Sequence, residues 1–383
     1  MRKVCVVVGS RANYSSIKSA MRAIDNHPNL ILQVVATSSA LLDRYGQVVD
    51  LIEQDGFKID DRVYMLMEGE TPLTMAKSTG IGTIELASTF DRLHPDIVVT
   101  IGDRFETMAT TIASTYMNIA LAHTMGGEVT GTIDESIRHA ITKFAHIHFP
   151  ACKDAVERIQ KLGELPESIH NVGCPRLDLV ADIINNLDQV DMSPIANEGV
   201  GDNIDISKPF IILSQHPVTT EYGEGEKQIL NSLRAIKETG LAAIVLWPNG
   251  DAGSEDIARG MRKFREHEDN GNFHYFKNLP IDVYIKLMKN TACLVGNSSS
   301  GIRDGAFIGT PSVNIGTRQN MRERGKNVID VDNDQTEIFE GIAKQIEHGS
   351  YKSEAIYGDG NAGQRIAEVL ATCEWNIQKT ITY

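Results

Sequence analysis

Two acidic side chains stand where parallel-sheet enzymes place their chemistry. Asp103 follows the apolar run Ile97–Ile101 and Gly102, and Asp134 opens a stretch whose apolar residues recur every three or four positions. A carboxylate after a strand can exchange protons with a substrate, or it can simply cap the next helix. Asp134 and Arg138 are four apart on the expected helix, which suits either a surface ion pair or one side of a site.

Groups suited to a phosphate stand at other turns. Arg11 follows the first apolar run, where an arginine beside a helix start suits an anion, although an ordinary turn arginine fits the local sequence equally well. The segment Gly296–Asp304 offers hydroxyls and backbone N–H groups at a helix start, which favours a diphosphate over a serine-rich cap. His216 follows a further apolar run. Gly316–Gln319 could line a base pocket or form a polar turn.

The elements that must position these residues alternate between two patterns. Unbroken apolar runs such as Val4–Val8 and Phe210–Leu213 alternate with amphipathic stretches, which predicts parallel sheets covered on both faces. We therefore expect an α/β protein with two doubly wound, Rossmann-like domains facing a cleft, with ligands beyond the carboxyl ends of the strands. The expected divisions are an N-terminal domain that carries the acidic candidates, a polar linker, a second domain that carries most of the phosphate-type groups, and a C-terminal helix that packs back on the N-terminal domain: residues 1–185, 186–208, 209–365 and 366–383.

Composition narrows the class of protein. The 383 residues carry a formal net charge of −14, which argues against non-specific binding to nucleic acid or to an anionic membrane. No apolar run approaches the ~18 residues of a membrane span, and the start resembles a strand rather than a secretion signal, so a cytoplasmic location is expected. The five scattered cysteines form no C-x-x-C pair and predict neither a zinc site nor disulfides. The absence of G-x-G-x-x-G and Walker patterns weighs against nicotinamide and ATP-loop chemistry.

Six segments in this order resemble one family, the hydrolysing UDP-N-acetylglucosamine 2-epimerases of sialic and related nonulosonic acid pathways. They are GSRANYSSIK, IGDRFET, GGEVTGTIDESIRHAITKFAH, QHPVTT, GNSSSGIRDG and GTPSVNIGTRQ, and the resemblance runs from about residue 3 to residue 370. It implies a glycosyltransferase-B-like fold and a reaction without metal or cofactor. In that reaction, UDP leaves a UDP-N-acetylhexosamine to give a 2-acetamidoglycal, and water then yields N-acetylmannosamine. A homodimer or homotetramer is expected on the same basis.

The resemblance also implies residue roles. Asp103 and Asp134 take the family's acid/base positions, and Glu128 and His216 complete the expected catalytic set. Arg138 would hold Asp134, and His216 would contact the phosphate. The residues expected to bind the substrate are Arg11, Met125, Arg138, Asn249, Asn297, Ser298, Ser299, Ser300, Gly301, Asp304 and Arg318.

Two positions depart from the family pattern. Relatives read H-I-E-G-G-E where this chain has His123-Thr124-Met125-Gly126-Gly127-Glu128, and a thioether cannot transfer protons. Glu128 or Asp103 could substitute, or the substrate could be a UDP-2,4-diacetamido-2,4,6-trideoxyhexose, whose more apolar sugar would suit methionine. Asp304 stands where relatives carry a ribose-binding glutamate. Arg259 and Arg262 match an arginine pair of a feedback site in animal relatives, but a solvated helix face fits them better.

Three alternatives to the hydrolysing reaction are open at this point. A non-hydrolysing epimerase would read H-R-R-E where this chain has His216-Pro217-Val218-Thr219, which favours the hydrolysing branch. A glycosyltransferase with the same fold would need an acceptor sugar. A nucleotide-sugar sensor without catalysis is the third alternative, and Met125 gives it some support.

Overall fold

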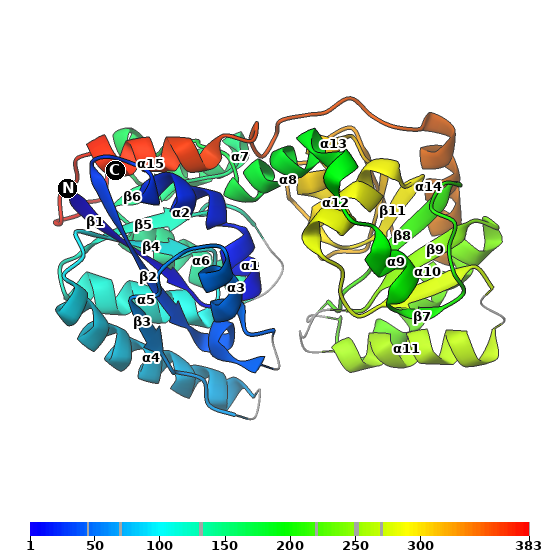
Figure 1. Ribbon diagram of the computed structural model, residues 1–383, viewed down its shortest axis with the longest axis horizontal. Helices are drawn as coiled ribbons and strands as arrows, with labels where there is room; N and C mark the ends of the chain where they lie inside the picture. Colours follow the sequence, from blue (N-terminus) through cyan, green and yellow to red (C-terminus); the bar gives the residue numbers. More distant parts are fainter. Residues whose placement is uncertain are drawn as a thin grey trace. The chain divides into compact units, whose positions relative to one another are not determined.

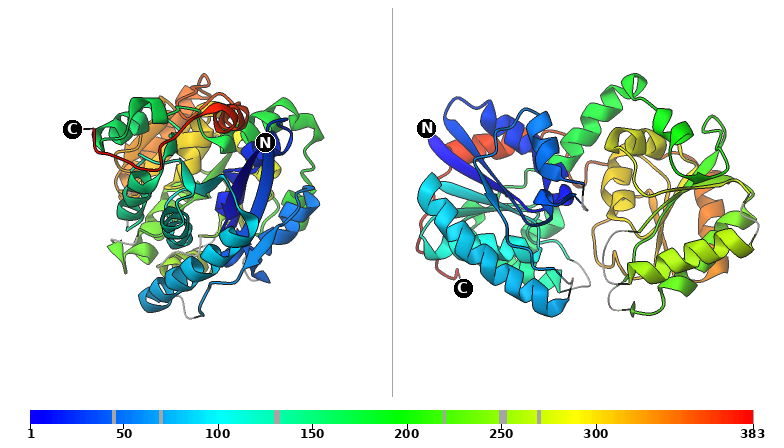
Figure 2. Two further views of the ribbon diagram at one scale, coloured as in Figure 1. Left: turned by 90° about the vertical axis from the view of Figure 1, so that its left-hand side faces the viewer. Right: turned by 60° about the horizontal axis from the view of Figure 1, so that its bottom comes forward.

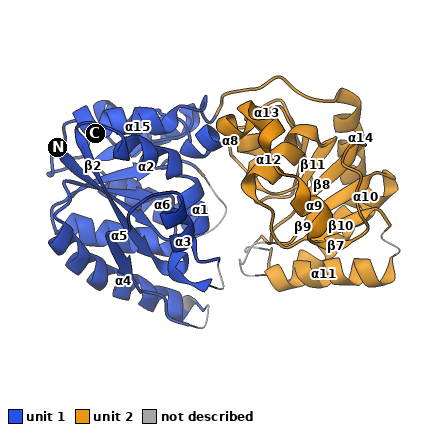
Figure 3. Ribbon diagram, viewed as in Figure 1, with its two compact units in different colours: residues 1–128, 133–179, 357–383 blue, residues 129–132, 180–356 orange. Residues whose placement is uncertain are grey.

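The computed structural model describes residues 1–43, 46–68, 71–129, 133–218, 221–248, 253–268 and 271–382. The chain forms two compact units, coloured separately in Figure 3. Unit 1 contains residues 1–128, 133–179 and 357–383, and unit 2 contains residues 129–132 and 180–356. Each unit has its own sheet, so the expected pair of doubly wound α/β domains is confirmed.

Unit 1 is built on a six-stranded parallel sheet in the order β3-β2-β1-β4-β5-β6. The strand order reverses between the neighbouring strands β1 and β4, and ligands of doubly wound sheets bind at such a point. The strands are β1 (Arg2–Val8), β2 (Leu30–Thr37), β3 (Asp61–Val63), β4 (Ile97–Ile101), β5 (Ala120–Thr124) and β6 (Ile147–Phe149).

Helices cover both faces of this sheet (Figure 1). Because side chains alternate along a strand, Val4, Val6 and Val8 of β1 join the core beneath one helical layer, and Cys5 and Val7 join the core beneath the other. The helices of unit 1 are α1 (Arg11–Ser15), α2 (Lys18–Asp25), η1 (Ser38–Leu41), α3 (Val48–Gln54), α4 (Pro72–Leu93), α5 (Phe105–Tyr116), α6 (Asp134–Phe144), α7 (Lys153–Lys161), η3 (Pro166–Ser168) and α15 (Ala362–Thr372).

Unit 2 is built on a seven-stranded sheet in the order β13-β12-β11-β8-β9-β10-β7. All neighbours pair in parallel except β7, which runs antiparallel to β10 at one edge. The strands are β7 (Val200–Gly201), β8 (Phe210–Ser214), β9 (Ala242–Leu246), β10 (Phe273–Phe276), β11 (Cys293–Gly296), β12 (Ser312–Ile315) and β13 (Val328–Val331). The helices are α9 (Ser193–Asn197), α10 (Gly225–Glu238), α11 (Ser254–His267), α12 (Ile281–Asn290), α13 (Ser299–Ile308) and α14 (Gln335–His348), with η4 (Leu187–Gln189).

The segment 186–208, which we expected to be a linker, belongs to the fold of unit 2. It contains η4, α9 and the edge strand β7, whose Val200 and Gly201 pair with Tyr275 and His274 of β10. The division between the units falls earlier, inside α8 (Pro175–Asn185). The polar composition of the segment reflects an exposed edge of a sheet rather than a free connection.

The end of the chain returns to unit 1 at Tyr357. In Figures 1 and 2, α15 lies beside α2, and Ile366, Ala367 and Leu370 of α15 are fully buried in the core of unit 1. The helices approach closely because Gly363 has no side chain: a Cβ there would lie 2.6 Å from the backbone carbon of Ser19. No helix among the described residues is long and apolar enough to cross a membrane.

Candidate active site

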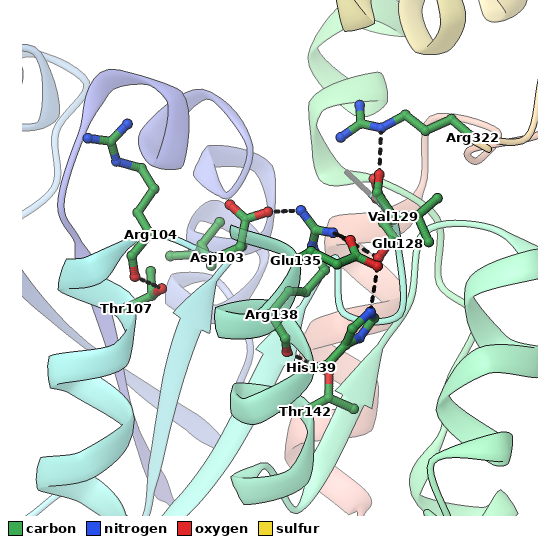
Figure 4. A network of polar contacts seen from close by, with 12 residues as sticks. Asp103, Arg104, Thr107, Glu128, Val129, Glu135, Arg138, His139, Thr142 and Arg322 are labelled. Carbon is green, nitrogen blue, oxygen red and sulfur yellow. Dashed lines mark hydrogen bonds and ion pairs between the residues drawn. The ribbon is translucent and has the colours of Figure 1, made fainter. Parts of the chain in front are cut away.

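The turn after β4 carries a carboxylate held by a buried arginine. Gly102 adopts a left-handed φ of 77°, and the following Asp103 forms an ion pair with Arg138 Nη2 (Figure 4). The Arg138 side chain is 2% exposed, so this residue is buried in the site instead of forming a surface ion pair. Such an ion pair favours the charged form of Asp103, because both partners are largely shielded from water.

Arg138 also connects the other acid-bearing segments of unit 1. Its Nη1 donates to the backbone oxygen of Glu128 at 2.8 Å and to Glu135 Oε2 at 3.1 Å. Asp134 lies one turn earlier on the same helix, at the positive end of α6. One guanidinium therefore ties together the segments that carry Asp103, Glu128 and Asp134.

A buried histidine, His123, contacts both the turn that carries Asp103 and the helix α6. His123 Nε2 lies 2.8 Å from the carbonyl oxygen of Gly102, and its Nδ1 lies 3.3 Å from Thr142 Oγ1 on α6. Burial lowers the pKa of His123 to about 3, and the contact with Gly102 opposes that effect. A neutral imidazole therefore links the Asp103 turn to α6. The sequence places this histidine in a family motif but gives no signal of these contacts.

Met125 occupies the strained position between β5 and the paired glycines. Its backbone has a φ of 59°, in the left-handed region that a side chain rarely adopts. Its Sδ lies 3.9 Å from Cys174 Sγ, and the residue packs against the core of unit 1. A polarizable thioether thus stands where relatives of the resembling family carry an acid.

The structure adds to this region another acid, which the sequence analysis did not single out. Glu106, in the first turn of α5, is 1% exposed, and its Oε1 accepts a hydrogen bond from Arg104 Nε at 3.0 Å. Burial raises the pKa of Glu106, Arg104 opposes this, and the charge of Asp134 adds to the increase. In the sequence, Glu106 lies in the segment IGDRFET, three residues after Asp103, but nothing there indicates that it is buried.

Arg11 is exposed at the first position of α1, where the preceding Ser10 caps the helix by accepting a hydrogen bond from the Asn13 backbone N–H at 3.2 Å. Arg11 therefore lies in the first turn of a helix that follows β1, and its phosphate-binding role stays a prediction.

In unit 2, Asn297 brings three expected residues together. Its side-chain oxygen accepts from the His216 backbone N–H at 2.7 Å, and its Nδ2 donates to the His216 carbonyl at 2.8 Å. Its own carbonyl accepts from Arg318 Nη1 at 3.2 Å and from Gln319 Nε2 at 2.9 Å. The turns after β8, β11 and β12 are therefore held as one surface. Gln319, which the sequence analysis considered with Gly316–Gln319 but did not include among the expected substrate-binding residues, is a member of it.

The start of α13 completes this surface. Ser298 caps the helix by accepting from the Ser300 backbone N–H, and Ser300 Oγ lies 2.8 Å from the Tyr284 hydroxyl. Ser299 and Gly301 lie in the same first turn. At Gly296 a Cβ would lie 2.1 Å from the Ser214 carbonyl oxygen, so only glycine fits between the two strands. A small pocket is lined by Ser214, Leu294, Val295, Gly296, Ser298, Gly301, Ile302, Ser312, Val313, Asn314 and Val328.

Four other positions that the sequence analysis named remain to be placed. Asp304 is fully buried on α13, and Asn249 lies outside the described residues. Arg259 pairs with Asp256 at 3.2 Å, and Arg262 pairs with Glu255, so the arginines of the possible feedback site are engaged by neighbouring acids. Among the described residues, no group of three or more His, Cys, Asp or Glu side chains could hold a metal ion.

Comparison with known proteins identifies the class to which this fold and site belong. A family model described as UDP-N-acetylglucosamine 2-epimerase matches residues 22–371. The chain is 32% identical over 372 residues to the UDP-N,N'-diacetylbacillosamine 2-epimerase (hydrolyzing) of Legionella pneumophila, which covers 97% of this chain and 96% of that protein. It is 30% identical over 385 residues to the UDP-N-acetylglucosamine 2-epimerase of Neisseria meningitidis, with 98% and 97% covered.

The chain belongs to the UDP-N-acetylglucosamine 2-epimerase family. The resemblance read from the six segments is thereby confirmed, and the protein belongs to a family of enzymes. The crystal structure of the Neisseria meningitidis UDP-GlcNAc 2-epimerase bound to UDP-GlcNAc has the same fold, with a TM-score of 0.81 at 18% identity, covering 96% of this chain and 99% of that one.

Proposed function

We propose that this protein is a hydrolysing 2-epimerase that releases UDP from a UDP-N-acetylhexosamine. The observation that carries the proposal is the buried Arg138, which ties the segments of Asp103, Glu128 and Asp134 to one place. Removing the weakly acidic C2 proton of such a sugar needs a placed carboxylate, and departure of UDP needs groups that stabilise its growing negative charge. Asp103 and Asp134 are the proposed acid/base pair.

In the proposed reaction a carboxylate takes the C2 proton, the C1–O bond breaks, and the bonding pair leaves with UDP. The resulting 2-acetamidoglycal adds water: hydroxide joins C1, and a proton returns to C2 from the opposite face. In unit 2, His216, Arg318 and the first turn of α13 would bind the diphosphate. In unit 1, Arg11 is the residue that we propose for an anionic group of the substrate.

Two substrates are consistent with this chemistry. UDP-N-acetylglucosamine would give N-acetylmannosamine for sialic acid synthesis. The second is a UDP-2,4-diacetamido-2,4,6-trideoxyhexose, and Met125 specifically favours it, because its thioether packs beside Cys174 and offers the sugar an apolar neighbour in place of an acid. Two relatives, from Legionella pneumophila and Campylobacter jejuni, are named for diacetylbacillosamine nucleotides.

The test is to incubate the protein with each nucleotide sugar, without an acceptor, and to measure free UDP and the released sugar. We expect UDP and a free 2-epimerised sugar, with a higher kcat/KM for the diacetamido substrate if Met125 sets the preference. Met125→Glu should then shift the preference toward UDP-N-acetylglucosamine, and Met125→Gln is the matched control, because it adds polarity without proton transfer.

Other outcomes would contradict the proposal. An epimerised UDP-sugar without hydrolysis would indicate the non-hydrolysing reaction, and UDP release only with an acceptor sugar would indicate a glycosyltransferase. If Asp103→Asn retains UDP-sugar affinity but the wild-type protein turns over neither substrate, a sensor is the better description.

A further inference from the structure

The chain after α15, residues 373–382, lies against the amino ends of the strands of unit 1, away from the turns that carry the candidate site. Arg2, at the start of β1, donates from Nη1 to the carbonyl oxygen of Cys373 at 2.7 Å. His146, directly before β6, has its Nε2 3.3 Å from the carbonyl oxygen of Ile377. In the left view of Figure 2 the red segment crosses this end of unit 1. It therefore connects the start of β1 with the start of β6, the strand at one edge of the sheet.

Lys379 fastens this segment to the end of α6. Its Nζ donates to the backbone oxygen of Lys143 at 2.8 Å and to that of Ala145, and it forms an ion pair with Glu164 Oε2 at 2.7 Å. The last carbonyl groups of a helix have no partner within the helix, and this end of a helix favours a positive charge. The three hydrogens of the ammonium group therefore meet three acceptors, two of which belong to the end of α6.

Glu164 is the buried acid of this cluster. Its side chain is 3% exposed, its Oε1 accepts from Lys143 Nζ at 2.5 Å, and His148 Nε2 lies 3.1 Å from its Oε2. Burial raises the pKa of Glu164, but hydrogen bonds from the histidine and from the two lysines outweigh it and lower that pKa to about 2. Burial lowers the pKa of His148, so the two ammonium groups supply the positive charge. Without Lys379, only one of them would compensate the buried carboxylate.

The other end of α6 carries residues of the candidate site. Asp134 is the first residue of this helix, and Arg138, one turn later, forms the ion pair with Asp103. The helix has 11 residues and is about 16 Å long. A regular helix of this length moves as one rod, because its backbone hydrogen bonds join each turn to the next. Contacts that fix its last turn therefore also restrict the positions of Asp134 and Arg138.

We propose that Lys379 is a positioning residue for the 2-epimerase reaction. By holding the last turn of α6, it keeps Asp134 and Arg138 in the place from which Arg138 pairs with Asp103. This inference rests on the proposed function and adds to it a part of the chain without a motif. The segment 373–382 lies outside residues 22–371, which the family model matches, and none of the six sequence segments contains it.

The kinetic test uses Lys379→Ala, assayed under conditions in which urea unfolding curves show the variant to be folded. We expect kcat for UDP release to fall about tenfold or more, because a small displacement of a reacting group is costly. KM should stay within about twofold, because the residues proposed to bind the diphosphate in unit 2 are unchanged. Lys77→Ala removes an exposed ammonium group from α4 of the same unit, and this matched control should leave kcat unchanged. An unchanged kcat in Lys379→Ala would overturn the proposal.

A second background separates position from stability. Glu164→Gln removes the buried charge, so adding Lys379→Ala to it should lower the free energy of unfolding less than adding Lys379→Ala to the wild type. The loss of kcat on adding Lys379→Ala should remain in this background, because the carbonyl groups at the end of α6 still lack their donor. If kcat recovers together with the free energy of unfolding, Lys379 serves stability alone and the proposal is wrong.

An NMR measurement tests the same inference without activity. The guanidinium signal of Arg138, assigned by its loss in Arg138→Lys, reports the ion pair with Asp103. In Lys379→Ala this signal should move toward its position in Asp103→Asn, and in Lys77→Ala it should not move. An unmoved signal in Lys379→Ala would show that the contact does not reach Arg138 and would overturn the proposal. If the wild type releases no UDP but the signal moves, the proposed function fails while the link between Lys379 and Arg138 stands.

Discussion

At the scale of single residues, the described site depends on buried charge. The nearly unexposed guanidinium of Arg138 contacts carboxylate oxygens of Asp103 and Glu135 and the backbone oxygen of Glu128. The planar, forked geometry of arginine suits such a multiple contact, and a lysine ammonium cannot reproduce it. The family segments of the sequence indicated that Arg138 is important, but its principal partner could not be read from the helical spacing, because Asp103 is brought to it by the fold.

We expect Arg138→Lys to lower the free energy of unfolding by about 2 kcal/mol, since it leaves Asp103 and the Glu128 carbonyl without their donors. It should also reduce kcat for UDP release at least tenfold. Urea unfolding and steady-state kinetics measure the two effects. Arg92→Lys is the control, because Arg92 forms an exposed ion pair with Asp61 on the same unit. If Arg92→Lys lowered the free energy of unfolding and kcat as much as Arg138→Lys does, the burial of Arg138 would not be the cause of these losses.

At the scale of elements, the turns at the carboxyl ends of the strands carry the site, and these turns were the most predictable part. Alternation of apolar runs and amphipathic stretches located β4, α5 and the start of α13. The same signal failed where an element is short or exposed. The pattern of Tyr14–Ile24 is typical of one helix, but the structure has two there, α1 and α2, separated at Ile17. The strand β7 consists of only two residues, and both are exposed. Glu106 was missed because an acid near a helix start is ordinarily an exposed one.

His123 of β5, which contacts the turn that carries Asp103, should make the free energy of unfolding depend on pH. The pKa of His123 falls from 6.5 to about 3 in the folded protein, so between these values the unfolded chain binds a proton that the folded chain does not. Stability should therefore decrease as the pH falls below 6.5, by up to about 1.4 kcal/mol per pH unit from this group. We would measure the free energy of unfolding in urea between pH 7 and pH 5. In His123→Gln this free energy should fall less steeply with decreasing pH than in the wild type.

The matched control is His267→Gln, which removes an exposed imidazole at the end of α11. It should leave the pH dependence of the free energy of unfolding as in the wild type. A His123→Gln variant with the wild-type pH dependence would show that this imidazole is protonated in the folded state.

At the scale of the whole molecule, the two units can be followed independently, because each contains one of the two tryptophans. Trp375 packs against the core of unit 1, and Trp247 packs against the core of unit 2. The repeated alternation of strands and helices predicted two doubly wound domains. The exact division did not follow from polarity, because an exposed sheet edge and a connecting segment have the same composition.

We expect Leu370→Ala on α15 to destabilise unit 1 by about 3 kcal/mol, since it creates a cavity in a fully buried position. In a Trp247→Phe background, the fluorescence of Trp375 should show the unfolding midpoint moving to lower urea. In a Trp375→Phe background, the Trp247 transition should not move. Ile342→Ala, at a fully buried position in unit 2, should give the reverse pattern. A shift of both transitions by either substitution would mean that the units unfold as one.

The return of the chain to unit 1 has a consequence for the order of events during synthesis. Residues 180–356 make up nearly all of unit 2 and are inserted between two parts of unit 1, so the ribosome finishes unit 2 first. The strands made earliest must wait, with the surface for Ile366 and Leu370 still uncovered, until the last residues emerge. Unit 1, whose synthesis begins first, is therefore completed last.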